Sequence, residues 1–304
     1  MSQSKKVVAI CVATYKRPEL LVNCIESIRQ IEIPETIIPI IIVVDNDKDR
    51  TAESSFTATI NKTELDAYYY VEPDRGICSA RNCLLEKALQ HNADYIAFVD
   101  DDELAHSLWL VNMIKGLEKY KCEITAGPVI PIYETTPPLD FTTDPKRPAG
   151  MVPRNIPAGN VLFDTKLIKE LELRFDRYFD FIGCEDFDFF DRAVKMKMKS
   201  VWLDDAIIFE TITPDRQTRK YLMHRHLTGG INVVMRFRRH HSLLHAWLRY
   251  LPKALGKFIG AFCSIIMAIF ISREQNVNKF IIKLFNGAGY ICGLTNIIIE
   301  RYRY

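Results

Sequence analysis

Short apolar runs rich in β-branched residues alternate with longer amphipathic stretches over roughly the first 120 residues of this 304-residue chain. The predicted strands are Val7–Ala13, Ile37–Val44, Tyr68–Val71 and Tyr95–Val99. The predicted helices are Glu19–Arg29, 51–65, Ser79–His91 and Ser107–Tyr120. Strands that are apolar throughout need cover on both faces, which helices between parallel strands provide. The alternation therefore predicts an α/β fold with a mostly parallel sheet flanked by helices.

Polar residues follow each of the four predicted strands. They are Thr14–Arg17, Asp45–Asp47, Glu72–Gly76 and Asp100–Glu103. In open parallel sheets, ligands bind beyond the carboxyl ends of the strands, because loop amides and helix N-termini converge there. The sequence therefore predicts a single polar site at this edge of the sheet.

Four acidic residues, Asp100, Asp101, Asp102 and Glu103, follow the fourth predicted strand directly. Adjacent carboxylates repel one another, so such a run is costly unless a cation neutralises it. In an extended loop, Asp100 and Asp102 point the same way and can share one hard divalent ion. The alternative is a solvated acidic turn that caps the helix beginning near Ser107.

A second acidic group, Gly183–Asp188, opens another predicted helix. We expect the apolar stripe of this helix to be Phe187, Phe190 and Val194. Carboxylates at a helix N-terminus are also common as simple caps, so this group alone does not establish a functional site. Between the two acidic groups, residues 127–157 contain eight prolines, which predicts loop and edge strand.

Taken together, these motifs resemble those of family 2 glycosyltransferases, which have the GT-A (Rossmann-like) fold. In chain order they are Thr14–Pro18, Val43–Asp47, Gly76–Asn82, Phe98–Glu103, Gly159–Asn160 and Glu185–Asp186. The resemblance covers about residues 7–230. Within the family, the chain is most similar to bacterial exopolysaccharide glucosyltransferases of the succinoglycan type.

The resemblance implies a nucleotide-sugar donor, UDP-linked, and a divalent cofactor. The implied donor-binding residues are Thr14, Arg17, Asp45, Arg81, Asp100 and Asp101. Among them, Thr14 and Asp45 would hold the nucleobase and ribose, and Arg81 would lie near the phosphates. Asp100 and Asp102 match the family's D-x-D motif and would hold Mn²⁺ or Mg²⁺ against the diphosphate.

The resemblance also implies how the acceptor is activated. Asp186 would be the general base and Glu185 would orient the base or the acceptor, so that a single displacement inverts the anomeric centre. Gly159 and Asn160 would line the acceptor side. Further diphosphate contacts would come from Arg216, Arg219 and His224. For the two arginines, a basic surface facing a membrane is the alternative.

The last third of the chain differs in charge from the rest. Residues 1–210 hold 25 Lys/Arg against 35 Asp/Glu, whereas residues 211–304 hold 15 against 3. We expect a GT-A catalytic domain at 1–210 and a basic, amphipathic helical region at 211–304. The apolar stretches Phe258–Ile271 and Phe280–Ile299 are short or interrupted, which favours helices lying on an anionic membrane surface over spans. A helical subdomain packed on the catalytic body or on a second chain is the alternative.

Three smaller sequence features of this region can be interpreted without a further binding site. Gly287–Gly289 follows no strand, so helix packing by small residues explains it better than a dinucleotide motif. His241 and His245 lack a third ligand nearby, which favours interfacial histidines over a metal site. The segment Arg216–Tyr221 lacks the Gln-x-x-Arg-Trp order of processive family members, so we expect one sugar to be transferred per encounter.

The sequence therefore predicts a metal-dependent, inverting hexosyltransferase of surface polysaccharide biosynthesis. It would transfer a single sugar to a lipid-linked saccharide acceptor at the cytoplasmic face of the cell membrane. The eight cysteines form no C-x-x-C pair, which is typical of reduced thiols in the cytosol. The alternatives are a nucleotidyltransferase, disfavoured because Thr14–Pro18 lacks glycine, and a non-catalytic nucleotide-binding membrane scaffold. Nucleic acid is not an expected partner, because the body is acidic.

Overall fold

The computed structural model describes residues 4–61, 65–133, 147–153, 155–271 and 273–299. The chain forms two compact units. The first unit comprises residues 1–132, 143–180 and 185–211, and the second comprises residues 133–142, 181–184 and 212–304. Each unit is described by itself.

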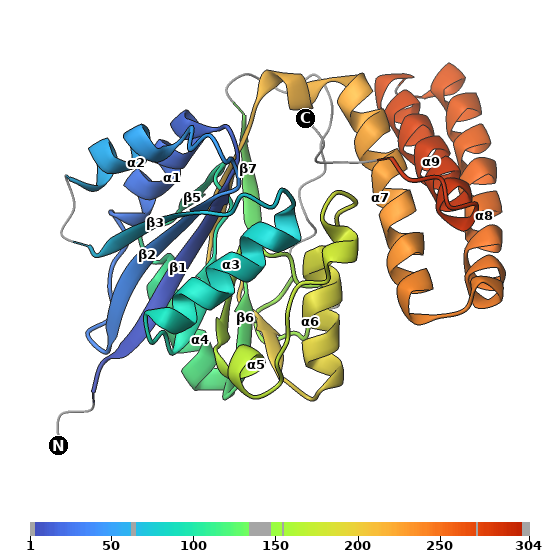
Figure 1. Cartoon of the computed structure of the whole chain (residues 1–304). Coiled ribbons are helices and arrows are strands. Elements are labelled where there is room, and N and C mark those ends of the chain that lie inside the picture. The colour runs from blue at the N-terminus through green and yellow to red at the C-terminus, as the bar shows by residue number, and fades with distance from the viewer. Residues whose placement is uncertain (1–3, 62–64, 134–146, 154, 272, 300–304) are drawn as a thin grey trace. The chain divides into compact units, whose positions relative to one another are not determined.

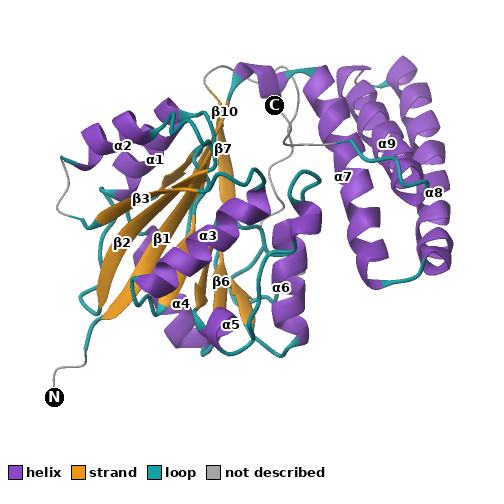
Figure 2. Cartoon of the chain, in the orientation of Figure 1, coloured by secondary structure: helices purple, strands orange, loops and turns teal. Residues whose placement is uncertain are grey.

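A seven-stranded sheet forms the centre of the first unit, with strand order β3-β2-β1-β4-β8-β6-β9 (Figures 1 and 2). Its strands are β1 (Lys6–Thr14), β2 (Ile37–Asp45), β3 (Ala67–Val71), β4 (Tyr95–Phe98), β6 (Ile124–Ala126), β8 (Val161–Asp164) and β9 (Ser200–Trp202). Neighbouring strands are parallel except that β8 runs antiparallel to both β4 and β6. A second sheet of three strands has the order β5-β10-β7. Its strands are β5 (Glu103–Ala105), β7 (Val129–Tyr133) and β10 (Ile208–Ile212).

Helices cover both faces of the seven-stranded sheet. Alternate residues of β1 point to opposite faces, so Ala9 and Cys11 join one hydrophobic cluster while Val8 and Ile10 join the other. The first cluster includes side chains of α3 (Ile77–Gln90), α5 (Lys166–Lys169) and α6 (Glu185–Lys195). The second includes side chains of α1 (Pro18–Ile28), α2 (Glu53–Ile60) and α4 (Trp109–Tyr120). This confirms the predicted α/β class with a mostly parallel sheet.

Most predicted elements match the observed ones in this unit, but the helix predicted over 51–65 is observed over Glu53–Ile60, and the predicted core of α6 is partly wrong. Pro18 occupies the first turn of α1, where its missing N–H costs nothing. The predicted core stripe of α6 is wrong at two of three positions. Phe190 is buried, but Val194 is 37% exposed and Phe187 is only partly buried. Phe189, which the predicted stripe omits, is fully buried instead and stacks on Phe175 with ring centroids 4.3 Å apart.

The proline-rich segment is described only in part. As predicted, it supplies an edge strand, because β7 is the last strand of the three-stranded sheet. Three of its eight prolines, at 137, 138 and 145, lie in the segment 134–146, which is outside the described residues, as is residue 154.

The described part of the second unit contains three long helices (Figure 1). They are α7 (Arg219–His240), α8 (Leu243–Phe270) and α9 (Arg273–Leu294), preceded by the 3₁₀ turn Pro214–Gln217. Helix α9 packs against both α7 and α8. The packing of α7 on α9 depends on small residues, because a Cβ at Gly289 would overlap the carbonyl oxygen of Leu227. Helix packing is therefore the correct reading of Gly287–Gly289.

Helix α8 is longer than the sequence predicted. The expected apolar stretch began at Phe258, but the helix begins at Leu243 and has 28 residues. By length and composition, it is the one helix in the described part of the chain that could cross a membrane. Helix α9 also departs from its predicted range, since it begins at Arg273 and ends at Leu294.

We predict that Gly289→Ala destabilises the packing of α7 on α9, because the added methyl group has no space. The cost should be about 1–3 kcal/mol, the range for overpacking a tight contact. Gly229→Ala is the matched control, since a Cβ there meets nothing within 4 Å in the same helical setting. Hydrogen exchange of α7 and α9 amides measures both. Equal protection in the two variants would contradict the packing described.

Candidate active site

The acidic run lies in the turn between β4 and β5 and is largely removed from water. Asp101, Asp102 and Glu103 are each at most 8% exposed, whereas the Asp100 side chain is 45% exposed. Burial raises the pKa of Asp101 to about 7 and raises the pKa of Glu103 well above its usual value. The alternative of a solvated acidic turn is therefore wrong for three of the four carboxyls.

Two residues from the end of β1 hold this run. Arg17 Nη1 lies 3.2 Å from Asp101 Oδ1 and 3.4 Å from Asp102 Oδ2. Thr14 Oγ1 donates a 2.9 Å hydrogen bond to Asp101 Oδ2. The charge of Arg17 opposes the effect of burial on the pKa of Asp101. The Arg17 guanidinium thus balances part of the negative charge of the acidic run. From the sequence alone, a metal ion is expected to neutralise that charge.

Arg81 joins the acidic run to the second acidic group. Its guanidinium is 7% exposed; Nη2 lies 3.3 Å from Asp100 Oδ1, and Nη1 pairs with Glu185 Oε1. Glu185 is the first residue of α6 and directly precedes Asp186. The two acidic groups, about eighty residues apart in sequence, therefore meet around one arginine side chain.

Asp186 is partly buried beside this ion pair. Its Oδ2 accepts a 3.2 Å hydrogen bond from the Ala158 amide, and its Oδ1 accepts one of 2.7 Å from the Phe187 amide. Burial raises the pKa of Asp186, while the charge of Arg81 opposes the rise. A carboxylate with a raised pKa is a better proton acceptor than an ordinary aspartate.

The segment Ala158–Gly159 forms a second connection between the two groups. Glu103 Oε2 accepts a 2.8 Å hydrogen bond from the Asp100 amide, which fixes the turn. The same carboxyl lies against Gly159, where a Cβ would overlap Glu103 Oε1. Since the preceding residue, Ala158, donates its amide to Asp186, two consecutive backbone residues contact both acidic groups.

The polar side chains at the end of β2 make hydrogen bonds to the following loop, to β3 and to the loop after β3. The carboxylate of Asp45 is fully buried and accepts hydrogen bonds from the Asp47 and Ala52 amides and from Tyr69 Oη, the last at 2.6 Å. Asn46 Oδ1 accepts a 2.8 Å hydrogen bond from the Gly76 amide. The contact of Asp45 with a nucleobase or ribose stays a prediction.

One pair of residues at this edge was missed by the sequence reasoning. The Arg75 guanidinium carbon lies 4.4 Å from the centroid of the Tyr15 ring, so the loops after β1 and β3 meet there. Tyr15 and Arg75 both lie in the polar segments that the sequence places at the ends of strands. Their position after a strand is the feature from which the pair could have been identified. A tyrosine ring at the carboxyl edge of a parallel sheet is a surface on which a base can stack.

The predicted acceptor residue Asn160 faces the interior. It is fully buried; its Oδ1 accepts a 2.8 Å hydrogen bond from Trp109 Nε1, and its Nδ2 donates to the carbonyls of Pro128 and Ala206. An acceptor role for this residue stays a prediction, and the side chain in this arrangement does not offer its amide to a ligand. Arg216, Arg219 and His224 belong to the second unit, and their role also stays a prediction.

The oxygen ligands that the acidic turn offers are chemically suited to a hard divalent ion. Asp100 and Asp102 supply carboxylate oxygens, the ligands that Mg²⁺ and Mn²⁺ prefer. Among the described residues, no group of three or more His, Cys, Asp or Glu side chains converges as a metal site. Any ion held here would therefore need oxygens from a ligand such as a diphosphate to complete its coordination.

A mostly parallel sheet with a buried acidic turn after β4, facing a carboxylate from a later helix, defines the GT-A class of transferase folds. Residues 9–190 match the family model for "Glycosyl transferase family 2". The chain belongs to this family, and it is a glycosyltransferase. This result favours the glycosyltransferase over the nucleotidyltransferase alternative.

Named relatives agree with this assignment. The chain is 27% identical over 301 residues to the succinoglycan biosynthesis protein ExoM of Rhizobium meliloti (strain 1021), which covers 96% of this chain and 94% of that protein. The mannosyltransferase PcManGT of Pyrobaculum calidifontis, solved with GDP-Man and Mn²⁺, has a TM-score of 0.66 at 15% identity, covering 97% and 88% of the two chains. S. aureus TarS 1-349, solved in complex with UDP, has a TM-score of 0.53 at 14% identity, covering 93% and 89%. These two structures support the fold.

We predict that Gly159→Ala destabilises the protein because its methyl group would displace the Glu103 carboxyl. The cost should be about 1–3 kcal/mol. In a Glu103→Ala background the same substitution should cost much less, since the overlapping atoms are absent. Denaturant unfolding followed by tryptophan fluorescence measures the double-mutant cycle. Additive effects of the two substitutions would show that Glu103 and Gly159 do not touch.

Proposed function

We propose that the protein is a metal-dependent, inverting hexosyltransferase that moves one sugar from a UDP-linked donor to a lipid-linked glycan in surface polysaccharide biosynthesis. The observation that carries the proposal is the pair of contacts made by Arg81. They place the acidic turn, which suits a metal-bound diphosphate, next to Glu185 and hence next to the candidate base Asp186.

Two kinds of similarity support the donor and the pathway. TarS has been solved with UDP and with UDP-GlcNAc, and PcManGT with GDP-Man, so structural neighbours bind nucleoside diphosphate sugars. The relative ExoM is named for succinoglycan biosynthesis. We assign Thr14, Arg17 and Asp101 to the donor side of the site, because they form one hydrogen-bonded group at the end of β1.

Asp100 and Asp102 would hold Mn²⁺ or Mg²⁺. When bound, the ion supplies positive charge that stabilises the departing nucleoside diphosphate. Arg81 adds a fixed positive charge beside Asp100. Since leaving-group departure is assisted in this way, the protein needs only one carboxylate to activate the acceptor.

Asp186 is that carboxylate in our proposal. It takes the proton from an acceptor hydroxyl as the hydroxyl oxygen bonds to the anomeric carbon and the bond to the diphosphate oxygen breaks on the opposite face. One displacement inverts the anomeric centre. Glu185 positions the base by anchoring the start of α6 to Arg81, and the backbone at Ala158 holds the Asp186 carboxylate in place.

The second unit would place the enzyme at its acceptor. Residues 211–304 are strongly basic, which favours contact with anionic lipids on the cytoplasmic face of the membrane. We propose that 1–210 is the catalytic domain and that 211–304 is the peripheral membrane region. A lipid-linked acceptor is confined to that surface, so this location would bring enzyme and acceptor together.

We predict that Asp186→Asn lowers kcat by about 10²–10⁴-fold, because the amide cannot accept the acceptor proton. Donor binding should remain, since the substitution leaves the acidic turn intact. In the wild type, kcat should fall as pH decreases through the raised pKa of Asp186, because only the ionised carboxylate is a base. This acid limb should be missing from the residual activity of Asp186→Asn.

Asp102→Asn provides the complementary measurement, since it should abolish Mn²⁺-dependent binding of UDP in calorimetry. Asp191→Asn is the control: it removes an exposed acid of α6 whose carboxylate pairs with Lys195, and it should behave as the wild type. Transfer at the wild-type rate by Asp186→Asn would contradict the assignment of the base.

A further inference from the structure

We propose that the corner between α7 and α8 binds the phosphate headgroup of an anionic phospholipid, and that the outer face of α8 then lies flat on the bilayer. This inference rests on the proposed membrane location and deepens it by naming a site. The corner site consists of Phe237, His241, His245, Leu248 and Arg249, which line a shallow, open depression of about 400 Å³ on the surface.

Arg249 supplies the permanent positive charge of the corner site. Its guanidinium carbon lies 4.9 Å from the centroid of Phe237 and 5.9 Å from that of Tyr250, so aromatic faces hold it in place. Among the described residues it has no carboxylate partner, unlike Arg17 and Arg81 in the first unit. A cation that is oriented by rings but not neutralised is suited to an anion from outside the chain.

Two histidines also line the corner site. The His241 ring stacks on Phe237, with centroids 3.9 Å apart and an interplanar angle of 4°, and its Nδ1 lies 3.0 Å from the Phe237 carbonyl oxygen. His245 Nδ1 lies 3.0 Å from Ser242 Oγ. His241 Nδ1 must donate to the carbonyl oxygen, so His241 Nε2 can donate to a phosphate oxygen only when the ring is an imidazolium, whereas His245 can donate through Nε2 in the neutral tautomer whose Nδ1 accepts from Ser242.

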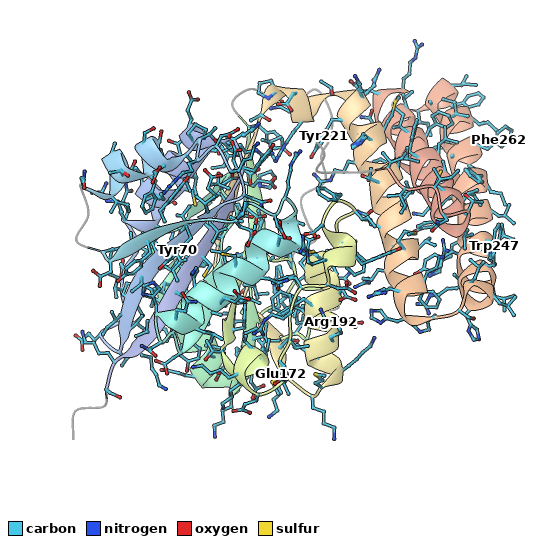
Figure 3. All side chains as sticks on the ribbon, in the orientation of Figure 1. Tyr70, Glu172, Arg192, Tyr221, Trp247 and Phe262 are labelled. Atoms are coloured by element: carbon cyan, nitrogen blue, oxygen red, sulfur yellow. The ribbon has the colours of Figure 1, made fainter. Side chains whose placement is uncertain are left out.

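An apolar stripe begins at the corner site and runs the length of α8. This stripe, called the outer stripe below, consists of Leu244, Leu248, Leu251, Leu255, Ile259, Phe262, Ile266 and Ile269. Their spacing of three or four residues places them on one helical face, and each is 36–77% exposed. Figure 3 shows the Phe262 side chain projecting outward from α8. The opposite face, with Ala246, Tyr250 and Ala254, is buried. So extensive an exposed apolar surface marks an interaction site.

Charge complementarity identifies the occupant as an anionic bilayer. The sequence has no Asp or Glu between Asp215 and Glu274, and Lys253 and Lys257 follow Arg249 at four-residue intervals beside the outer stripe. A helix with an apolar face bordered by basic residues is typical of one lying in the plane of an anionic surface. A second copy of this chain would instead bring equally basic surfaces together.

The position of the charges argues against α8 crossing the bilayer. Lys257 lies near the middle of the helix, so a span would place its ammonium group deep in the hydrocarbon. Beyond the other end of α8, Arg219 Nη2 lies 3.6 Å from Glu274 Oε1, and this ion pair would also have to enter the membrane. With α8 flat on the surface, all of these charges can remain in water or among headgroups.

Vesicle binding by the full-length protein tests the proposal. We expect strong binding to vesicles of phosphatidylcholine mixed with phosphatidylglycerol and weak binding to pure phosphatidylcholine. Arg249→Gln should weaken binding to the mixed vesicles at least about fivefold. Lys279→Gln, which removes the same charge from an exposed position on α9, should have a smaller effect. Phe262→Ser should weaken binding to both kinds of vesicle.

Other outcomes would overturn the proposal. Equal effects of Arg249→Gln and Lys279→Gln would mean that vesicle binding depends only on the net charge of the protein and that no corner site exists. Displacement of the protein by inorganic phosphate, beyond the effect of chloride at equal ionic strength, would identify free phosphate as the ligand. Resistance of the bound protein to extraction at alkaline pH would indicate a span.

The proposed enzymatic function can fail separately from this one. Mn²⁺-dependent hydrolysis of UDP-sugars in solution needs no vesicle, and Arg249→Gln should leave it unchanged. If the wild type does not hydrolyse UDP-sugars but still binds vesicles in an Arg249-dependent way, the proposed enzymatic function is refuted. The proposed headgroup site is then still supported. Intact hydrolysis with vesicle binding that does not depend on Arg249 would refute the headgroup site alone.

Discussion

The paired contacts of the buried Arg81 side chain hold the catalytic unit together where its chemistry must occur. Arg81 comes from α3, Asp100 from the turn after β4 and Glu185 from the start of α6, so one guanidinium joins three elements. Removing one partner of a buried ion pair typically costs about 3–5 kcal/mol, because the other charge is left unpaired. The arrangement therefore fixes the distance between the acidic turn and Asp186 more firmly than loops alone could.

The acidic turn illustrates how a costly arrangement is sustained. Burial by itself disfavours ionised Asp101 and Glu103, and raises the pKa of each. Arg17, Thr14 and the Asp100 amide offset part of this cost through direct contacts. The more exposed Asp100 remains at the edge of the group, where a diphosphate and its metal ion could approach. The two proposed metal ligands thus differ in burial, since Asp102 is 8% exposed and paired with Arg17 whereas the Asp100 side chain is 45% exposed.

The sheet could be predicted from the sequence because its strands are continuous β-branched runs with polar ends. The same rule located Asp100–Glu103 and the loops after β1, β2 and β3. Side-chain direction could not be predicted in the same way. Asn160 bonds to Trp109, and Phe189 stacks on Phe175, and both contacts depend on partners far away in the sequence. The start of α8 at Leu243 was also missed, because Arg249, Lys253 and Lys257 interrupt its apolar pattern.

The kinetic effect of Arg81→Lys is the most direct test of the central claim that one arginine joins the donor and base sides of a single site. Lysine keeps the charge but cannot make two separate contacts in the same planar geometry. We expect kcat/KM for sugar transfer to fall about 10²-fold, the effect of misplacing catalytic groups by about 1 Å. Arg192→Lys, which alters a less buried pair with Asp188 on α6, should leave the rate near that of the wild type. An Arg81→Lys enzyme as active as the wild type would contradict the account.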